Sequence, residues 1–174
     1  MVRIPAGTFQ MGSPDTERSR WSDEGPVHTV NIGYAFYMGK YEVTQARFYF
    51  GDSLGVNDDC EDDGIRSQYM WYCDNSTPSG SKPVGGKLPN AFRLYDMSGN
   101  LWEWRQDRWR SDYTGAPTDG SAWESNPAYS TRVLRGGSWS NNAPYCRAAD
   151  RNYLTPDYRL YFVGFRVVCA VGAN

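Results

Sequence analysis

Four cysteines and a single histidine are the residues of this sequence best suited to metal or redox chemistry: Cys60, Cys73, Cys146, Cys169 and His28. No Cys-x-x-Cys pair and no second histidine at zinc-ligand spacing accompanies them, so a zinc site is not indicated. One histidine also excludes a mechanism that needs a histidine cluster. The four cysteines allow two disulfides in three connectivities. The absence of a visible signal peptide favours free thiols, and a buried free thiol packs as a small hydrophobic group.

A different chemical pattern occupies residues 140–163, which we call the variable segment: SNNAPYCRAADRNYLTPDYRLYFV. It has no Lys, Glu, Gln, Met or Trp, and every residue in it can be encoded by a codon ending in a pyrimidine. Random substitution of the adenines of AAC (Asn) codons produces such a set. Such substitution could produce the residues Ser140, Asn142, Tyr145, Asp150, Asn152, Tyr153, Leu154, Thr155, Tyr158, Leu160, Tyr161 and Phe162.

Between and beyond these positions lie residues that we call the frame: Cys146, Arg147, Ala149, Arg151, Pro156, Arg159, Gly164, Phe165 and Arg166. A displayed surface of Tyr and Phe with Ser, Asn and Thr suits ligand binding, because rigid rings supply contact area and the small polar groups supply adaptable hydrogen bonds. The alternative is ordinary aromatic packing beside a strand. We expect the arginines of the frame to pair with Asp150, Asp157 and backbone carbonyls, although they could also attract an acidic ligand.

Six motifs follow one another along the chain: Ile4–Ser13 (IPAGTFQMGS), Glu24–Val30 (EGPVHTV), Lys40–Thr44 (KYEVT), Pro89–Trp104 (PNAFRLYDMSGNLWEW), Arg135–Trp139 (RGGSW) and Gly164–Val168 (GFRVV). In this order they closely resemble the formylglycine-generating-enzyme (sulfatase-modifying factor) family. The resemblance implies a C-type-lectin-like fold, with His28 as a structural hydrogen-bonding residue. A family motif similar to Leu-Pro-Thr-Glu-Ala-Glu-Trp-Glu is missing, so the chain is a minimal version of the domain.

The resemblance fails where the family's oxidase chemistry is located. The enzymes resemble Gly-Gly-Ser-aromatic-x-Cys-x-x-x-Tyr-Cys, in which two cysteines bind copper(I). Aligned on Gly136, the second cysteine is Cys146, whereas the first position holds Asn141. Copper(I) prefers soft thiolate ligands, and an amide oxygen replaces one poorly. We therefore expect no catalytic residues and no copper. A divergent copper- and oxygen-dependent oxidase acting on a peptide cysteine is the alternative.

The variable segment in turn resembles the variable region of diversity-generating retroelement target proteins, many of which use this lectin-like fold. That resemblance implies a ligand-binding protein whose variable side chains share a solvent-exposed face. Its partner would be a protein or cell-surface ligand. A module with one fixed partner is a further alternative, which predicts an identical segment in every copy of the gene.

The Pro89–Trp104 motif also resembles a calcium site of the family. Carried over residue by residue, Asp96 and Glu103 supply side-chain oxygens, and Gly99 and Leu101 supply backbone carbonyls. Hard oxygen ligands in a tight loop suit a structural Ca²⁺ ion. In the alternative, Asp96 and Glu103 cap turns and pair with Arg93 or Arg105.

Alternating and β-branched stretches predict short strands within 2–11, 28–42, 132–139 and 161–171, and Thr44 is suited to cap a helix over 45–50. Residues 52–87, with their acidic run at 58–63, indicate a long loop anchored by 70–72. The chain is thus predicted to be one α+β domain, 1–174, with a small antiparallel sheet and few helices. A net charge of −2 argues against nucleic-acid and membrane partners. No apolar run is long enough to span a bilayer, no signal peptide is visible, and we expect a monomer.

Overall fold

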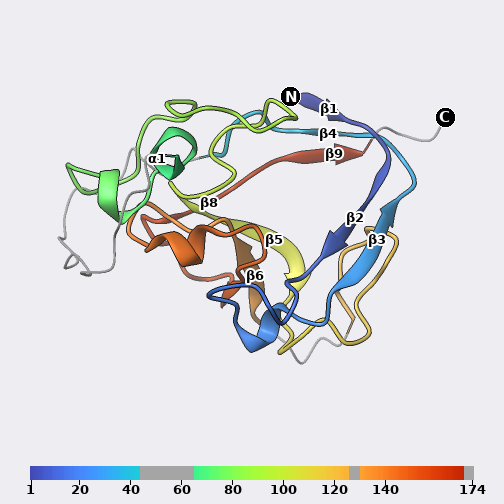
Figure 1. Ribbon diagram of the computed structural model, residues 1–174. Coiled ribbons are helices and arrows are strands. Elements are labelled where there is room, and N and C mark those ends of the chain that lie inside the picture. The colour runs from blue at the N-terminus through green and yellow to red at the C-terminus, as the bar shows by residue number, and fades with distance from the viewer. Residues whose placement is uncertain (44–64, 126–129, 171–174) are drawn as a thin grey trace.

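A computed structural model describes residues 1–43, 65–125 and 130–170 of the chain (Figure 1). The predicted α+β class is confirmed, with short strands that form three small sheets. Strands near the two ends of the chain meet in one antiparallel sheet of order β1-β4-β9, made of Val2–Ile4, Phe36–Met38 and Val168–Ala170. A second sheet is the antiparallel pair β2 (Gly7–Met11) and β3 (His28–Ile32).

The third sheet, of order β7-β6-β5-β8, carries the residues of functional interest. Its strands are β5 (Trp102–Arg108), β6 (Arg132–Arg135), β7 (Asn152–Leu154) and β8 (Val163–Phe165). Only the β5–β8 pair is parallel. Both β7 and β8 come from the variable segment or its flank, so this sheet determines where the segment's side chains point.

Helices are few and short within the described ranges. The α-helix α1 spans Arg66–Tyr69, and 3-10 helices span Ser22–Glu24, Cys73–Asn75 and Ala143–Cys146. None of the described helices is long and apolar enough to cross a membrane.

Two apolar clusters form the core. Trp102, Leu134 and Val163 lie on one face of the four-stranded sheet. Met70, Tyr72 and Cys146 form the second cluster, which confirms that the stretch 70–72 is anchored in the core. The core is small, so buried polar contacts have to hold much of the irregular backbone in place.

Most of the predicted strands are present but short, and two observed strands, β5 and β7, were not predicted. The stretches 132–139 and 161–171 contain only β6 and the pair β8 and β9. Strand β5 was not expected because Glu103, Arg105, Asp107 and Arg108 make its sequence strongly polar. The helix expected over 45–50 and the acidic run at 58–63 lie outside the described residues.

The expectation of free thiols is wrong at one cysteine. Cys73 is disulfide-bonded. Cys146 and Cys169 are free, so the possible disulfide between them is not formed. Cys146 is buried as expected of a core thiol. Cys169 is exposed, because β9 pairs only with β4 in its three-stranded sheet.

Candidate functional site

Asn141, at the position of the first copper cysteine in the family pattern, is a structural hydrogen-bond acceptor. Its Oδ1 accepts hydrogen bonds from Trp102 Nε1 at 2.9 Å, from Ser138 N at 3.0 Å and from Ser138 Oγ at 2.6 Å. Ser138 and Trp102 are both buried. The amide oxygen therefore accepts hydrogen bonds from three donors. With an apolar residue in place of Asn141, the backbone N–H and the indole N–H would have no acceptor.

Cys146, the retained cysteine, lies in the core. Its thiol is 3% exposed and sits 4.0 Å from the carbonyl oxygen of Ser138. Burial, together with the nearby Asp150 carboxylate, raises the pKa of Cys146 to about 12. A thiol that stays protonated at neutral pH is a poor nucleophile and a poor metal ligand.

The Gly-Gly-Ser turn explains how this thiol becomes sealed. Gly137 adopts a φ of +71°, and a Cβ at this position would lie 2.6 Å from Cys146 Sγ and 2.7 Å from the carbonyl oxygen of Tyr145. The missing side chain lets the 3-10 helix Ala143–Cys146 pack directly on the turn. The turn is thus required for packing whether or not the site is catalytic.

Part of the variable segment is displayed on the surface. Asn152 and Tyr153 of β7 and Tyr158 in the following turn are exposed, with 48% of Tyr153 and 56% of Tyr158 accessible. The Tyr153 ring packs 4.5 Å from that of Trp109, measured between centroids. The exposed tyrosine therefore rests on a second ring contributed by the chain just beyond β5.

Asp150 does not belong to that surface. It is 1% exposed, and neither carboxylate oxygen has a hydrogen-bond partner. Burial raises its pKa to about 7, and Glu24 contributes to the rise. The prediction of Asp150 as a displayed binding residue is therefore wrong, because the turn before β7 points this side chain inward.

Several other predicted binding residues are half-buried. Four of them pack against the cluster around Trp102: Tyr145, Leu154, Leu160 and Phe162. The Tyr161 ring packs against Trp139 and meets Phe162 edge-on. Ser140 and Thr155 are also only partly exposed. For these side chains, much of the contact is ordinary aromatic and apolar packing beside a strand, which is the alternative to display on a binding surface.

A groove of about 340 Å³ gives Asn142 and Tyr145 access to solvent. Ser19, Arg20 and Trp21 form its opposite wall, and the Trp21 and Tyr145 rings stack with centroids 6.0 Å apart. Sequence analysis missed both Trp21 and Trp109 as companions of the variable segment. They lie far from it along the chain, and no local spacing links them to it.

The frame arginines bond to backbone carbonyls as predicted, since Arg147 donates to those of Pro144 and Ser19, but their ion pairs within the described residues are not with Asp150 or Asp157. Arg147 Nη1 lies 2.8 Å from Glu17 Oε1, and its Nη2 forms an ion pair with Glu24, whose side chain is fully buried. Arg151 donates to the carbonyl oxygen of Asp23 and not to Asp150 or Asp157. These bonds join the variable segment to residues 17–24.

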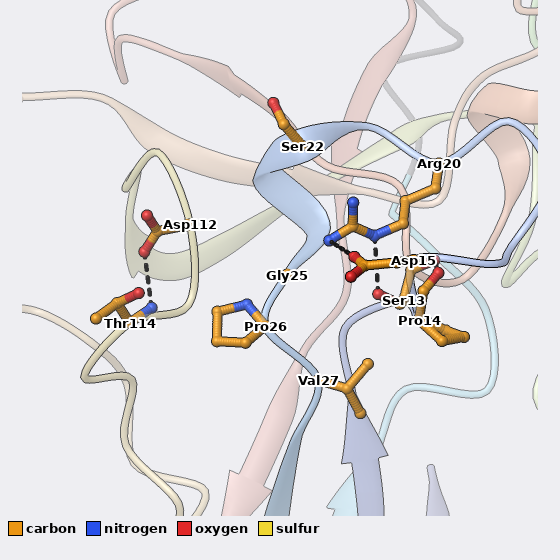
Figure 2. Close-up of a pocket in the computed structure, with 10 residues that line it drawn as sticks. All are labelled: Ser13, Pro14, Asp15, Arg20, Ser22, Gly25, Pro26, Val27, Asp112 and Thr114. Carbon is orange, nitrogen blue, oxygen red and sulfur yellow. Dashed lines mark hydrogen bonds and ion pairs between the residues drawn. The ribbon is translucent and has the colours of Figure 1, made fainter.

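A larger cavity, of about 520 Å³, is lined by residues outside the variable segment and shares Arg20 with the groove beside Tyr145 (Figure 2). Figure 2 shows its polar groups bonded to one another: Arg20 pairs with Asp15 at 3.1 Å and donates to the carbonyl oxygen of Ser13. Across the cavity, Asp112 accepts the backbone N–H of Thr114 at 2.7 Å. These internal bonds leave the cavity without a strongly unsatisfied group to attract a ligand.

Residues 1–53 and 54–171 match the sulfatase-modifying factor enzyme 1-like domain. The chain belongs to this family. The expected resemblance is thereby confirmed. Pkn1, a serine/threonine-protein kinase of Chlamydia caviae, is 33% identical over 82% of this chain and 22% of its own length. The formylglycine-generating enzyme of Thermomonospora curvata is 36% identical over 51% of this chain and 31% of its own. The matching part of this chain thus spans under a third of the length of each of these relatives.

Solved structures agree on the fold. PvdO from Pseudomonas aeruginosa superposes with a TM-score of 0.80 at 25% identity, over 97% of this chain and 93% of that one. Treponema denticola variable protein 1 superposes with a TM-score of 0.74 at 22% identity, over 98% and 95%. Relatives of this family include named enzymes and a Bos taurus protein named as an inactive formylglycine-generating enzyme. Family membership alone therefore does not decide whether this domain is catalytic.

The four residues implied as calcium ligands lie in and just after a tight loop. Asp96 has a φ of +55° and Gly99 a φ of +74°, so the loop turns sharply. Asp96 Oδ1 and Glu103 Oε2 are buried without hydrogen-bond partners, although Glu103 Oε2 lies 3.0 Å from Arg105. Arg166 holds the other oxygen of Glu103 at 2.6 Å. The orphaned oxygens fit a hard cation, and the predicted alternative pairing with Arg105 is also present.

A third buried acidic side chain lies near the same loop. Glu42 is buried nearby, where burial, with the negative charges of Glu103 and Asp96, raises its pKa to about 9. Burial likewise raises the pKa of Asp96. Within the described ranges no three His, Cys, Asp or Glu side chains cluster closely enough to hold a metal by themselves. A calcium ion here would therefore depend on the backbone carbonyls of Gly99 and Leu101 as well as on the two carboxylates.

Proposed function

We propose that this sulfatase-modifying factor-like domain is a ligand-recognition module whose binding face is diversified by a retroelement. The observation that carries this proposal is that some side chains of the variable segment are exposed whereas others are buried. The variable residues Asn152, Tyr153 and Tyr158 are exposed, and the frame residues Cys146, Arg151 and Arg166 are buried. The division is not complete, because the frame residues Pro156 and Arg159 are also exposed and the variable residue Asp150 is buried. Such a division allows side chains on the face to change without loss of the fold.

The chemistry of the exposed positions supports recognition. Tyr153 and Tyr158 offer large amphipathic rings with few rotatable bonds, and Asn152 offers both a donor and an acceptor. The Trp21–Tyr145 groove adds a recessed aromatic wall beside Asn142. A protein or cell-surface ligand could bury these rings at modest entropic cost, which is the usual source of affinity at aromatic-rich interfaces.

An oxidase is disfavoured because the two copper positions are both committed to structure. Asn141 Oδ1 satisfies donors of Ser138 and Trp102, and the Cys146 thiol is buried with a raised pKa. Copper(I) binding would require a deprotonated thiolate and a second soft ligand. The domain would therefore retain the fold of the enzymes without their redox centre.

A structural calcium ion is proposed as well. When bound, it would neutralise the buried carboxylates of Asp96 and Glu103 and stiffen the loop between them. The support is that Asp96 Oδ1 and Glu103 Oε2 lack hydrogen-bond partners in the core.

Sequencing the coding region for residues 140–163 across a population of the source organism tests the proposed function. We expect substitutions to concentrate at adenines in the codons for Asn152, Tyr153, Tyr158 and the groove residues Asn142 and Tyr145. Codons for Cys146 and Arg151 should stay constant. A uniform segment in every copy would instead favour the fixed-partner module and contradict diversification.

A further inference from the structure

Strands β5 and β6 present two chemically different faces. Trp104 and Leu134 point to the apolar cluster around Trp102. Because side chains alternate along a strand, their neighbours Glu103 and Arg135 point to the opposite face. The pairing is irregular between Trp104 and Arg108, and Arg105, Asp107 and Arg108 all join Arg135 in lining one pocket. Arg135 is paired in register with Glu103, which places charged side chains of both strands together. The sheet thus carries a charged face on the side away from this cluster.

A small pocket of about 130 Å³ opens on this charged face. Arg105, Arg108, Arg135 and Arg151 all line it, and Asp107 is its single carboxylate. Arg105 is balanced by Glu103 at 3.0 Å. The lining therefore keeps a surplus of positive charge in a space large enough for one carboxylate or phosphate group.

Arg151 is the most confined of these cations. It is 7% exposed, and its guanidinium stacks on Trp109 and on Tyr113, with 4.4 Å from Cζ to each ring centroid. Its Nη1 bonds to a backbone carbonyl, and its Nε has no hydrogen-bond partner. Within the described residues it forms no ion pair with a carboxylate. Burial lowers the pKa of Arg151, and the neighbouring Arg135 lowers it further.

Arg135 is similarly held by neutral groups. Its Nη1 donates to the carbonyl oxygens of Ala149 at 2.7 Å and Asp150 at 3.0 Å, and its Nη2 donates to the hydroxyl of Tyr113. Two adjacent guanidinium groups held by neutral acceptors are costly to bury. An anion placed between them would offset that cost through charge-assisted hydrogen bonds.

A groove of about 580 Å³ continues from this pocket, and its lining mixes apolar side chains with polar ones such as Gln106 and Glu124. The two share Met11, Asp107, Tyr113 and Trp123 in their linings. Phe9, Val30 and Ile32 line the groove from the apolar face of the β2–β3 pair, whose other face carries polar side chains. The loop after β5 covers this side, since Asn31 N donates to the Thr118 carbonyl oxygen at 2.7 Å (Figure 1).

We propose that this arginine pocket and the groove beside it bind a small amphipathic organic anion, with its carboxylate at Arg151 and Arg135 and its apolar body along Phe9, Ile32 and Trp123. The proposal does not depend on the diversified face. Arg151 is the pocket's contribution from the variable segment, and it is a frame residue. The ligand of this site would accordingly be the same for every copy of the domain, whatever the exposed tyrosines recognise.

Isothermal titration of the native protein with naphthalene-2-carboxylate tests this site. Naphthalene-2-carboxamide is the neutral control of nearly the same shape, and inorganic phosphate is the control without an apolar body. We expect the carboxylate to bind at least about tenfold more tightly than the amide, because only the acid forms charge-assisted bonds to the guanidinium groups. Phosphate should bind more weakly than the acid.

Variants locate the binding. Arg151→Gln should weaken carboxylate binding about tenfold or more, whereas Arg159→Gln, at an exposed arginine of the same segment, should leave it unchanged. Trp123→Ala should weaken the carboxylate but not phosphate, which keeps the test valid if Arg151→Gln fails to fold. The proposal is overturned if the native protein does not bind the carboxylate, if acid and amide bind equally, or if binding survives both Arg151→Gln and Trp123→Ala.

Discussion

The indole Nε1 of Trp102 donates a hydrogen bond to Oδ1 of Asn141 over 2.9 Å, at the position where the formylglycine-generating-enzyme pattern has its first cysteine. The same oxygen accepts two bonds from Ser138. A cysteine in this place could not accept three such bonds with comparable strength. The asparagine therefore converts a metal-ligand position into a hydrogen-bonded junction between β5 and the variable segment.

Replacement of Asn141 by alanine should strongly destabilise the domain. The buried N–H groups of Ser138 and Trp102 would lose their acceptor, and we expect the free energy of unfolding to fall by about 2–4 kcal/mol. Urea denaturation followed by tryptophan fluorescence measures the change. Asn152→Ala, at an exposed position, should cost well under half as much. Equal losses in the two variants would show that Asn141 has no special structural role.

Arg147 should be equally intolerant of neutral replacement. Its ion pair with the fully buried Glu24 means that Arg147→Gln leaves a carboxylate without its counter-charge. Breaking such a pair costs about 3 kcal/mol or more. Arg159→Gln is the matched control, and we expect a change within about 0.5 kcal/mol because this side chain is exposed. Thermal unfolding of both variants would reveal the difference, and a mild effect of Arg147→Gln would argue against a fixed frame.

Replacing an exposed aromatic residue of the variable segment should change the free energy of unfolding much less than replacing a packed one. Tyr158→Ala should change the free energy of unfolding by less than about 1 kcal/mol because the ring is mostly exposed. Phe162→Ala should cost about 2–4 kcal/mol, since that ring packs against the cluster around Trp102. Comparable losses at both positions would contradict the division of the variable segment into displayed and packed parts.

Asp150 gives the domain a distinct pH dependence. Its pKa is about 7 in the folded chain, above the ordinary value of 3.8, so the folded state holds the proton more tightly than the unfolded state. Stability is therefore expected to fall as pH rises from about 4 to about 7, at no more than about 1.4 kcal/mol per pH unit from this group. Asp150→Asn should remove that slope and stabilise the protein at pH 8. An unchanged slope in the variant would assign the pH dependence to other groups.

Calcium should raise the thermal midpoint if the loop from Asp96 to Glu103 binds it. Free calcium at about 100-fold above its dissociation constant would add about 2.7 kcal/mol of stability. Magnesium should have a smaller effect because it demands a tighter octahedral shell. Asp96→Asn should abolish the calcium shift while leaving the Arg166–Glu103 pair in place. A midpoint that does not respond to calcium would favour the alternative in which Glu103 pairs with Arg105 and Arg166 and no ion is bound.

The fold and the segment of interest were largely predictable from sequence, because they rest on motifs and on strand alternation such as that of Phe9 and Met11. Strand β5 was not, since its charged residues are neutralised by distant partners such as Arg166, which pairs with Glu103. The burial of Asp150 and the stacking of Trp21 on Tyr145 were not predictable for the same reason. Contacts between distant parts of the chain decide them, and local residue patterns carry no signal of those contacts.

A copper(I) titration of the reduced native protein, with a competing chelator, decides most directly between recognition and oxidation. Cys146→Ser and Cys169→Ser variants separate the buried thiol from the exposed one. We expect no tight stoichiometric binding that depends on Cys146, because that thiol is buried and Asn141 offers no second thiolate. Tight one-to-one binding that is lost in Cys146→Ser and retained in Cys169→Ser would contradict this and restore the oxidase.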